Sequence, residues 1–476
     1  MKKLGCISLA STVPALCLLA SCSAPPVREK PVTQAVPPAW AEPRTVEPTV
    51  TLGARWWKIF NDPVLDALEE RALAGSPTMA KAVARVEEAR ALASVAAADR
   101  SLAINFDPSA NNARASKTDK LPPGFPIYTT RFRAAVDAGY EVDAWGRVKN
   151  NIAAARQDAA ALEADEAAVR LTLTGDVART YYQLRALEGQ VEVLKRTYSL
   201  REDATKVEQA RVDAGLMNEL SVSRSRLEIA TTRGTLESVE RQAAELRHAL
   251  AVLTGQPPAA AGTLAVVALT IPPSVPVGLP SEVLKRRPDV QAADLAVNAA
   301  LSRLGVARAA FFPQIKLTGS LGLESAELVN LLDVSSRIWS LGPSVSLPLL
   351  DGGRNQANYR AADARLQQTV ADYQARVLSV FREVEDALSD LQWLTRQSAS
   401  VEAALDAAKQ VSQLSRERYD KGLTNYLDTV DAERAVLDAE LSRVQLSGFR
   451  FVATVALAKS LGGGWDRGED GLAARD

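Results

Sequence analysis

The residues whose type and spacing most clearly suggest a chemical role are two aspartates, Asp428 and Asp431, placed three positions apart. In a helix this spacing puts both carboxylates on one face. Carboxylates gathered in this way concentrate negative potential, which favours cations. The alternative is an ordinary solvated helix face on which Asp431 pairs with Arg434. The spacing alone is compatible with both interpretations.

Enzymatic chemistry finds little support in the composition. His248 is the only histidine, and two of the three cysteines lie in an apolar N-terminal stretch. Phosphate-binding loops and nucleophile elbows are missing from the sequence, and no metal-ligand constellation can be assembled. The 56 basic and 57 acidic residues give no reason to expect a nucleic-acid partner. We therefore expect no enzyme, no catalytic residue, no metal and no cofactor.

Residues 1–21 are predicted to be a lipoprotein signal peptide. Two lysines precede an apolar run from Leu4 to Ala20 that is short for a membrane span. The run ends in Leu-Ala-Ser-Cys, which resembles a bacterial lipobox and would make Cys22 the lipidated first residue. An ordinary signal peptide with an incidental cysteine is the alternative. Residues 22–50 are then a proline-rich linker without a core of its own.

A ten-residue stretch occurs twice in the chain. It reads RVDAGLMNEL at 211–220 and RYDKGLTNYL at 418–427, with six of ten positions identical. Two Gly-Arg pairs, at 146–147 and 353–354, show the same offset of 207 residues. In both copies 69 positions separate the Gly-Arg from the glycine of the repeat. This common register indicates an internal duplication.

The stretches that precede the repeats are predicted to be long helices. Proline is absent between Ile127 and Gln256 and after Pro348, and apolar residues recur at alternating spacings of three and four, the pattern of helices that supercoil. Each helix would be roughly 100 Å long. Gly215 and Gly422 would end them as C-caps. A returning helix of about 40 residues would complete a long antiparallel hairpin in each half.

Four stretches change to a period of two, which indicates β-strands. They cover 104–115, 131–145, 315–323 and 339–349, and the clearest of them puts apolar residues on one face and charged residues on the other. One interpretation is a half-buried sheet in a soluble domain. The other is a transmembrane β-barrel with lipid outside and water inside. Four strands cannot close a barrel, so a barrel requires an oligomer.

The predicted fold class is mainly α, internally duplicated, with long antiparallel coiled-coil hairpins and four strands per chain. Two shorter helices, Pro77–Ile104 and Asp289–Ala310, would each precede strands. Residues 256–288 are proline-rich and are expected to be irregular. The predicted parts are a first repeat at 51–260 with strand pair 104–145, a second repeat at 261–461 with strand pair 314–350, and a C-terminal tail at 462–476 in an equatorial region.

An ordered set of motifs resembles the outer-membrane factors of the TolC family, in their lipid-anchored OprM/NodT-like branch. The set comprises the lipobox, WWKIFNDPVLDAL, YEVDAWGR, LPSEVLKRRPDVQAAD, GVARAAFFPQIKLTGSLG, LLDGGR, both tip repeats and the terminal LGGGW. The resemblance implies a homotrimer in outer-membrane lipid, with a twelve-stranded barrel and an α-barrel tunnel that passively conducts efflux substrates. It also implies docking onto a periplasmic membrane-fusion adaptor and an inner-membrane pump of the RND type. A periplasmic scaffold or adaptor without a pore is the alternative, but it leaves the strands unexplained.

The resemblance also assigns roles at the periplasmic tip, where an iris closes the tunnel. It implies that Asp428 and Asp431 ring the narrowest point and that Tyr419 is the gate tyrosine. The family's acidic partner of this tyrosine falls at Ser221, and a neighbouring arginine falls at Thr424, so the sequence does not define the closing contacts. Six tip residues are candidates for contact with the adaptor, with pure turn chemistry as the alternative: Arg211, Gly215, Leu216, Arg418, Gly422 and Leu423.

Overall fold

A computed structural model describes residues 25–30, 36–41, 53–116, 118, 126–215, 218–262 and 269–463. The predicted signal peptide, Cys22, Leu216 and nearly all of the predicted C-terminal tail lie outside these residues. The chain divides into two compact units. The strand unit contains Arg85–Leu162 and Ala292–Tyr373 with the N-terminal residues, and the hairpin unit contains Gln34–Ala84, Glu163–Gln291 and Gln374–Asp476.

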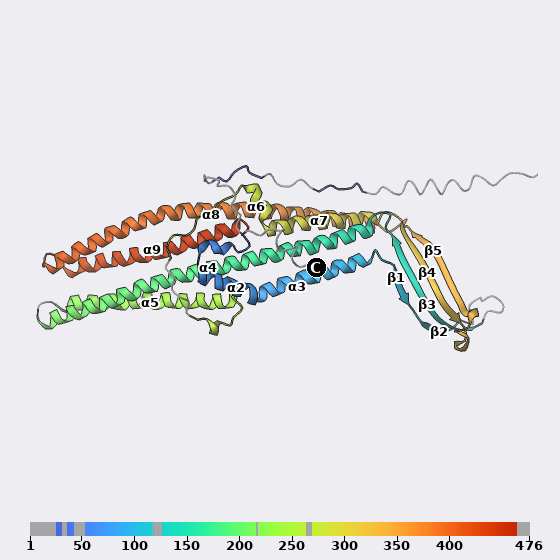
Figure 1. The fold of residues 1–476 in the computed structure, drawn as a ribbon, viewed down its shortest axis with the longest axis horizontal. Coiled ribbons are helices and arrows are strands. Elements are labelled where there is room, and N and C mark those ends of the chain that lie inside the picture. The colour runs from blue at the N-terminus through green and yellow to red at the C-terminus, as the bar shows by residue number, and fades with distance from the viewer. Residues whose placement is uncertain are drawn as a thin grey trace, which may run out of the picture. The chain divides into compact units, whose positions relative to one another are not determined.

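Two pairs of long helices dominate the fold (Figure 1). Helices α4 (Arg147–Asp213) and α8 (Arg354–Asp420) have 67 residues each, about 100 Å at 1.5 Å per residue. Helices α5 (Glu219–Leu253) and α9 (Tyr426–Ser460) return antiparallel to them and have 35 residues each. The equal lengths in both halves confirm the predicted duplication, although the return helices are shorter than the expected 40 residues. Within the described ranges, no helix is both long and apolar enough to cross a membrane.

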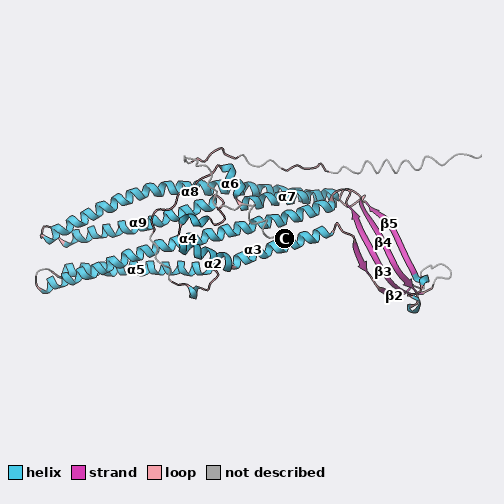
Figure 2. Cartoon of the chain, in the orientation of Figure 1, coloured by secondary structure: helices cyan, strands magenta, loops and turns pink. Residues whose placement is uncertain are grey.

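The strand unit holds one antiparallel sheet (Figure 2). Strands β1 (Ala103–Phe106) and β2 (Ser109–Arg114) both pair with β3 (Tyr128–Val142), so they form one line that Asp107 and Pro108 interrupt. Proline cannot donate a ladder hydrogen bond, which accounts for the break. Strand β3 pairs with β4 (Gln314–Ser325) of the other repeat, and β4 pairs with β5 (Arg337–Ser346). The sheet is therefore four strands wide, as predicted.

Three features of the helices differ from the prediction. The helix expected over Pro77–Ile104 ends early, because α3 spans Pro77–Ala98 and Ile104 pairs with Ala138 in the sheet. The segment expected to be irregular contains α6 (Pro280–Arg286) directly before α7 (Pro288–Ala309). An unpredicted helix, α2 (Pro63–Gly75), lies ahead of α3. Its start is marked by Asp62, whose side chain accepts backbone hydrogen bonds as an N-cap.

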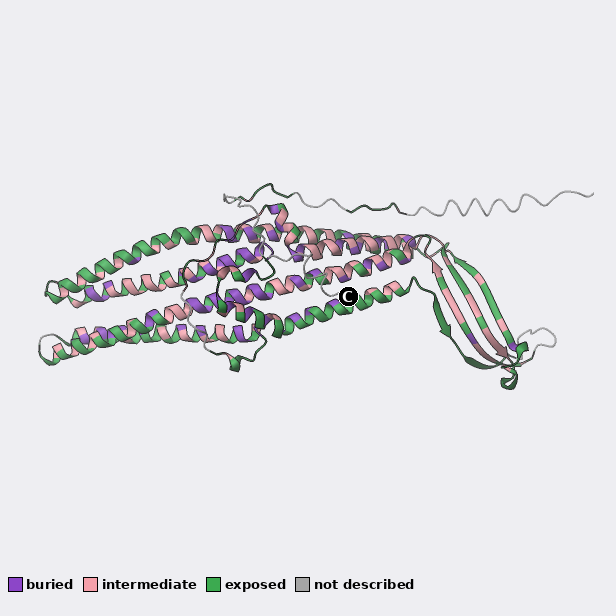
Figure 3. Ribbon diagram, viewed as in Figure 1, coloured by how far each residue is buried: buried purple, intermediate pink, exposed green. Residues whose placement is uncertain are grey.

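The core of the hairpin unit is rich in aromatic side chains, and Figure 3 shows buried residues gathered around α2 and the helices beside it. Trp56 and Trp57, in the 3-10 helix η1 (Trp56–Phe60), are almost fully buried. The ring of Phe60 lies 5.1 Å from that of Tyr182 on α4, and Tyr182 stacks at 4.7 Å on Phe451 of α9. Large buried aromatic surfaces of this kind hold η1 and α2 against the long helices.

In the strand unit, helices α7 and α8 form a smaller core that includes Val297, Leu304 and Tyr359. The described N-terminal residues lie against these helices. Arg28 pairs with Asp363 at 3.1 Å, and Lys30 pairs with Asp294 at 2.6 Å. Part of the predicted proline-rich linker is therefore bound to the helices of this unit through ion pairs.

Candidate gate at the hairpin tips

The repeated glycines end the long helices. Gly215 and Gly422 both have φ of +69°, the left-handed conformation that glycine adopts without penalty. The N–H of Gly422 donates to the carbonyl of Tyr419 at 2.9 Å, and the N–H of Leu423 donates to the carbonyl of Arg418 at 2.9 Å. These two bonds form a Schellman motif. Turn chemistry is thus the structural role of both glycines.

Each return helix begins with an asparagine N-cap. The side chain of Asn218 accepts a hydrogen bond from the N–H of Leu220, and that of Asn425 accepts one from the N–H of Asp428. The repeat therefore encodes a C-cap followed three residues later by an N-cap. This explains why glycine and asparagine recur at the same offset in both copies.

The two aspartates lie on the first turns of α9 and are exposed. Asp428 accepts a hydrogen bond from the hydroxyl of Thr424, and Asp431 accepts one from Nη1 of Arg434 at 3.2 Å. The ion pair considered from the sequence is therefore present in the single chain. Because both partners are about half exposed, such a pair contributes only about 0–1 kcal/mol.

Tyr419 finds an acidic partner on the other hairpin that sequence analysis missed. Its hydroxyl donates to Oε2 of Glu208 on α4 at 3.1 Å, and Glu208 is buried. Burial, together with the adjacent charge of Glu208, raises the pKa of Tyr419 to about 12. Arg211 lies 3.7 Å from the same carboxylate. The structure thus brings the predicted residues Tyr419 and Arg211 together around Glu208.

A second missed contact also joins the hairpins. Glu228 on α5 is buried, and its carboxylate receives Arg201 of α4 at 3.2 Å and Nε of Arg434 of α9 at 3.0 Å. Nearby, the hydroxyls of Ser225 and Tyr426 are 2.7 Å apart. Removing one partner of a buried ion pair leaves an uncompensated charge, which is costly. Glu228 therefore couples α4, α5 and α9 at one point.

A cavity of about 550 Å³ lies beside the Glu228 contacts. Its wall includes Glu433, which pairs with Arg416 at 3.2 Å. Burial raises the pKa of Glu433, although Arg416 acts in the opposite direction. The tip region thus contains several charged groups that pair across helices, whereas Leu423 and Arg418 at the turn itself are exposed.

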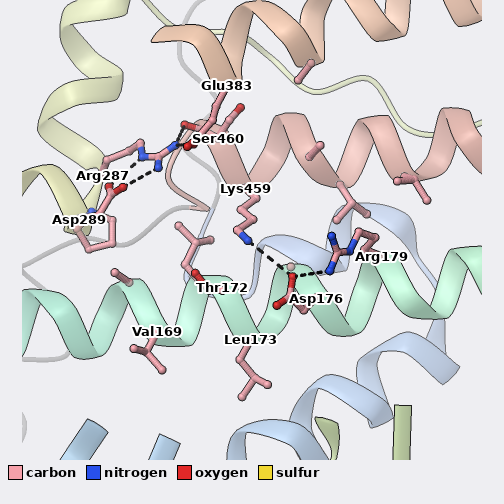
Figure 4. A pocket seen from close by; sticks show the side chains of 18 of the residues that line it. Val169, Thr172, Leu173, Asp176, Arg179, Arg287, Asp289, Glu383, Lys459 and Ser460 are labelled. Carbon is pink, nitrogen blue, oxygen red and sulfur yellow. Dashed lines mark hydrogen bonds and ion pairs between the residues drawn. The ribbon is translucent and has the colours of Figure 1, made fainter. Parts of the chain in front are cut away.

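A larger cavity, of about 760 Å³, lies further along the hairpin unit (Figure 4). Arg287, from the quoted LKRRPDV motif, donates two hydrogen bonds to Asp289 at 2.9 and 2.7 Å, one to Glu383 at 2.6 Å and one to the carbonyl of Ser460 at 3.1 Å. Burial would raise the pKa of Asp289, but the bonds from Arg287 outweigh this effect and lower it. Arg287 therefore fastens the start of α7 to α8 and to the end of α9.

Neither cavity presents a constellation for catalysis, and the described residues include no group of three or more ligands that could hold a metal ion. His248 is exposed on α5. Several of the charged groups that line them form ion pairs between different elements, such as Arg287 with Glu383 and Arg416 with Glu433.

Comparisons with known proteins agree with this geometry. The family model described as "Outer membrane efflux protein" matches residues 68–256 and 279–463. Outer membrane protein OprJ of Pseudomonas aeruginosa is 32% identical over 457 residues, with 94% of each chain covered. Cation efflux system protein CusC of Escherichia coli is 31% identical over 415 residues, which cover 87% of this chain and 89% of CusC. The solved outer-membrane channel OprN superposes with a TM-score of 0.84 at 29% identity, covering 92% and 99% of the two chains.

Paired long hairpins joined to an antiparallel sheet are the architecture of an outer-membrane channel. The chain belongs to the outer membrane efflux protein family. The predicted family, the mainly α fold class and the outer-membrane location are thereby confirmed. The family comprises efflux proteins of the outer membrane rather than enzymes.

Proposed function

We propose that three copies of this chain form a passive exit duct, anchored by a lipid on Cys22, that accepts substrates from a periplasmic adaptor and an RND-type inner-membrane pump. One relative, 31% identical over 411 residues, is named a probable outer membrane lipoprotein, SilC of Salmonella typhimurium. Other relatives carry names that refer to cation efflux, multidrug resistance and pyoverdine export. These relatives are about equally identical in sequence to this chain, yet their names refer to very different substrates. This supports a duct that does not itself choose the substrate, so that the pump selects it.

The observation that carries this proposal is the cross-strand pattern of the sheet. Val136, Leu321 and Trp339 are paired across three strands, and their side chains are 42%, 68% and 79% exposed. The adjacent row is Asp137, Ser320 and Ser340. Side chains alternate between faces along a strand, so one face of the sheet is apolar and the other polar. A lipid-facing outer surface and a water-facing lumen require this alternation.

The sheet edges support assembly as a trimer. Both the β1/β2 line and β5 are edge strands in the single chain, and unpaired edges must be covered or paired. Four strands are too few to close a barrel. Pairing each β5 with the β1/β2 line of the next copy would close twelve strands without a free edge.

In this proposal the hairpin tips form an iris. Asp428 and Asp431 of three copies would provide six carboxylates that attract cations at the narrowest point. The contacts of Tyr419 with Glu208 and of Arg434 with Glu228 would hold the two hairpins of each copy in the closed position. Exposed Leu423 and Arg418, together with Arg211 and Leu216, would contact the adaptor. Adaptor binding would open the tip by shifting the population toward separated hairpins.

A pair of substitutions on opposite sheet faces tests the assembly. Leu321→Asp puts a charge on the apolar face, whereas the control Thr318→Asp puts the same charge on the polar face of the same strand. We expect Leu321→Asp to reduce the amount of heat-modifiable trimer in outer-membrane fractions by at least roughly tenfold, since a charge facing lipid is strongly unfavourable. Equal trimer yields from both variants would contradict the assignment of the faces.

A further inference from the structure

Helix α2 buries an acidic side chain in its apolar face. The inward-facing residues of this helix are Leu65, Leu68, Glu69 and Ala72, and Glu69 has no exposed surface. Neither of its carboxylate oxygens has a hydrogen-bond partner among the described residues. A charged carboxylate that is buried without a partner is strongly disfavoured, so such a group takes up a proton instead. The tip contacts described above do not involve this residue.

No cation among the described residues acts on Glu69 to stabilise its charged form. The charge that acts on it is that of Asp66, one turn earlier on α2, and it is also negative. On α4, the hydroxyl of Tyr181 donates to Asp62 at 2.7 Å, and Tyr182 carries a pKa above its usual range because of burial and the nearby acidic groups. Arg185, on the same helix, stacks over Tyr181 and pairs with Glu188 at 2.6 Å.

The indole N–H of Trp57 on η1 is buried and also lacks a partner among the described residues. On α9, Phe451 packs on Tyr182, and its neighbour Arg450 does not contribute to the charge felt by Glu69. The environment therefore stabilises the neutral acid on every side that these helices present.

We propose that Glu69 is a proton-binding group that fastens α2 to the hairpin unit when neutral and loosens it when charged. Burial, with the negative charge of Asp66 as a smaller cause, raises the pKa of Glu69 to about 9 from an ordinary value of 4.5. An opened α2 exposes the carboxyl to water, where it ionises at its ordinary pKa. Opening is therefore promoted as the pH rises between these two values and levels off above about 9. Acidification has the opposite effect and tightens α2.

Amide hydrogen exchange of the full trimeric protein in detergent tests this proposal. The readout is the exchange of α2 peptides in wild type and in Glu69→Gln, which carries a neutral side chain of similar shape at every pH. The ratio of the exchange rate in wild type to that in Glu69→Gln is taken at each pH, which cancels the intrinsic pH dependence of amide exchange. We expect the opening of α2 in wild type relative to Glu69→Gln to increase about tenfold per pH unit between about pH 5 and 9.

Two controls keep the test decisive. Glu70→Gln, at the exposed neighbouring position, is expected to follow wild type at every pH. Glu69→Leu also removes the titratable group and provides the same comparison if the glutamine variant assembles poorly. The proposal would be overturned if the ratio of wild-type exchange to that of Glu69→Gln or Glu69→Leu did not change with pH. It would also be overturned if Glu70→Gln changed the pH dependence as much as Glu69→Gln does.

Discussion

The guanidinium of Arg434 on α9 donates to the buried carboxylate of Glu228 on α5, with 3.0 Å between Nε and Oε1. These residues belong to different hairpins and are 206 positions apart in the sequence. The same carboxylate receives Arg201 from its own hairpin. A single acid therefore joins both repeats of the chain.

Arg434→Ala is expected to favour separation of the hairpins. It removes one of the two guanidinium groups that compensate Glu228, at a cost of about 1–3 kcal/mol, because Arg434 itself is about half exposed. Single-channel recordings should show an open fraction that is higher by roughly fivefold to a hundredfold. Arg233→Ala, which removes an exposed pair with Glu237 within α5, is the matched control and should behave as wild type. Equal open fractions for both variants would show that the Glu228 contact does not hold the tip.

Tyr419→Phe should have a similar but smaller effect. The substitution deletes the hydrogen bond to Glu208 and is expected to cost about 1 kcal/mol. Limited proteolysis at the tips should become several times faster. Tyr198→Phe provides a control, since its hydroxyl bonds to Glu202 within α4 and does not join hairpins. Unchanged proteolysis of Tyr419→Phe would place the closing contacts elsewhere.

The glycine at the second tip can be tested against a glycine within a helix. Gly422→Ala forces a side chain into a left-handed conformation and should destabilise the protein by about 1 kcal/mol. Gly234 lies within α5 with open space around it, so Gly234→Ala should instead stabilise the helix by up to about 1 kcal/mol. Thermal unfolding midpoints should shift in opposite directions. Shifts of the same sign would contradict the cap assignment.

Because Asp289 forms an ion pair with Arg287, we expect the protein to lose stability in acid. Because the folded protein lowers the pKa of Asp289, this group stabilises the fold above its unfolded pKa, near 4, and that stabilisation is lost as the pH falls through the lower, folded value. Asp289→Asn should be less stable than wild type at neutral pH, and the difference should shrink below about pH 4. Asp203→Asn, at an exposed pair with Lys206, should leave the acid profile unchanged. A constant difference between Asp289→Asn and wild type would contradict the assignment.

Regular patterns in the sequence predicted the large elements of the fold. The common offset of Gly215 and Gly422 located both hairpins, and period-two alternation located the strands. Local patterns were less precise at the ends of elements: the helix expected to reach Ile104 ends at Ala98, whereas the strand expected to begin at Ile104 is present and pairs with β3. The partners Glu208 and Glu228 were missed because each contacts a residue on the other repeat, and helix pairing across 200 residues leaves no local signal.

The most direct test of the proposed channel is the single-channel conductance of the purified protein in a planar bilayer, with wild type compared to Asp428→Ala/Asp431→Ala. We expect a low conductance for wild type. In the double variant we expect the conductance to be higher and the preference of the pore for cations to be weaker. A pore that does not respond to the substitutions would place the constriction elsewhere. Well-folded trimers without any conductance would contradict the duct and favour a scaffold.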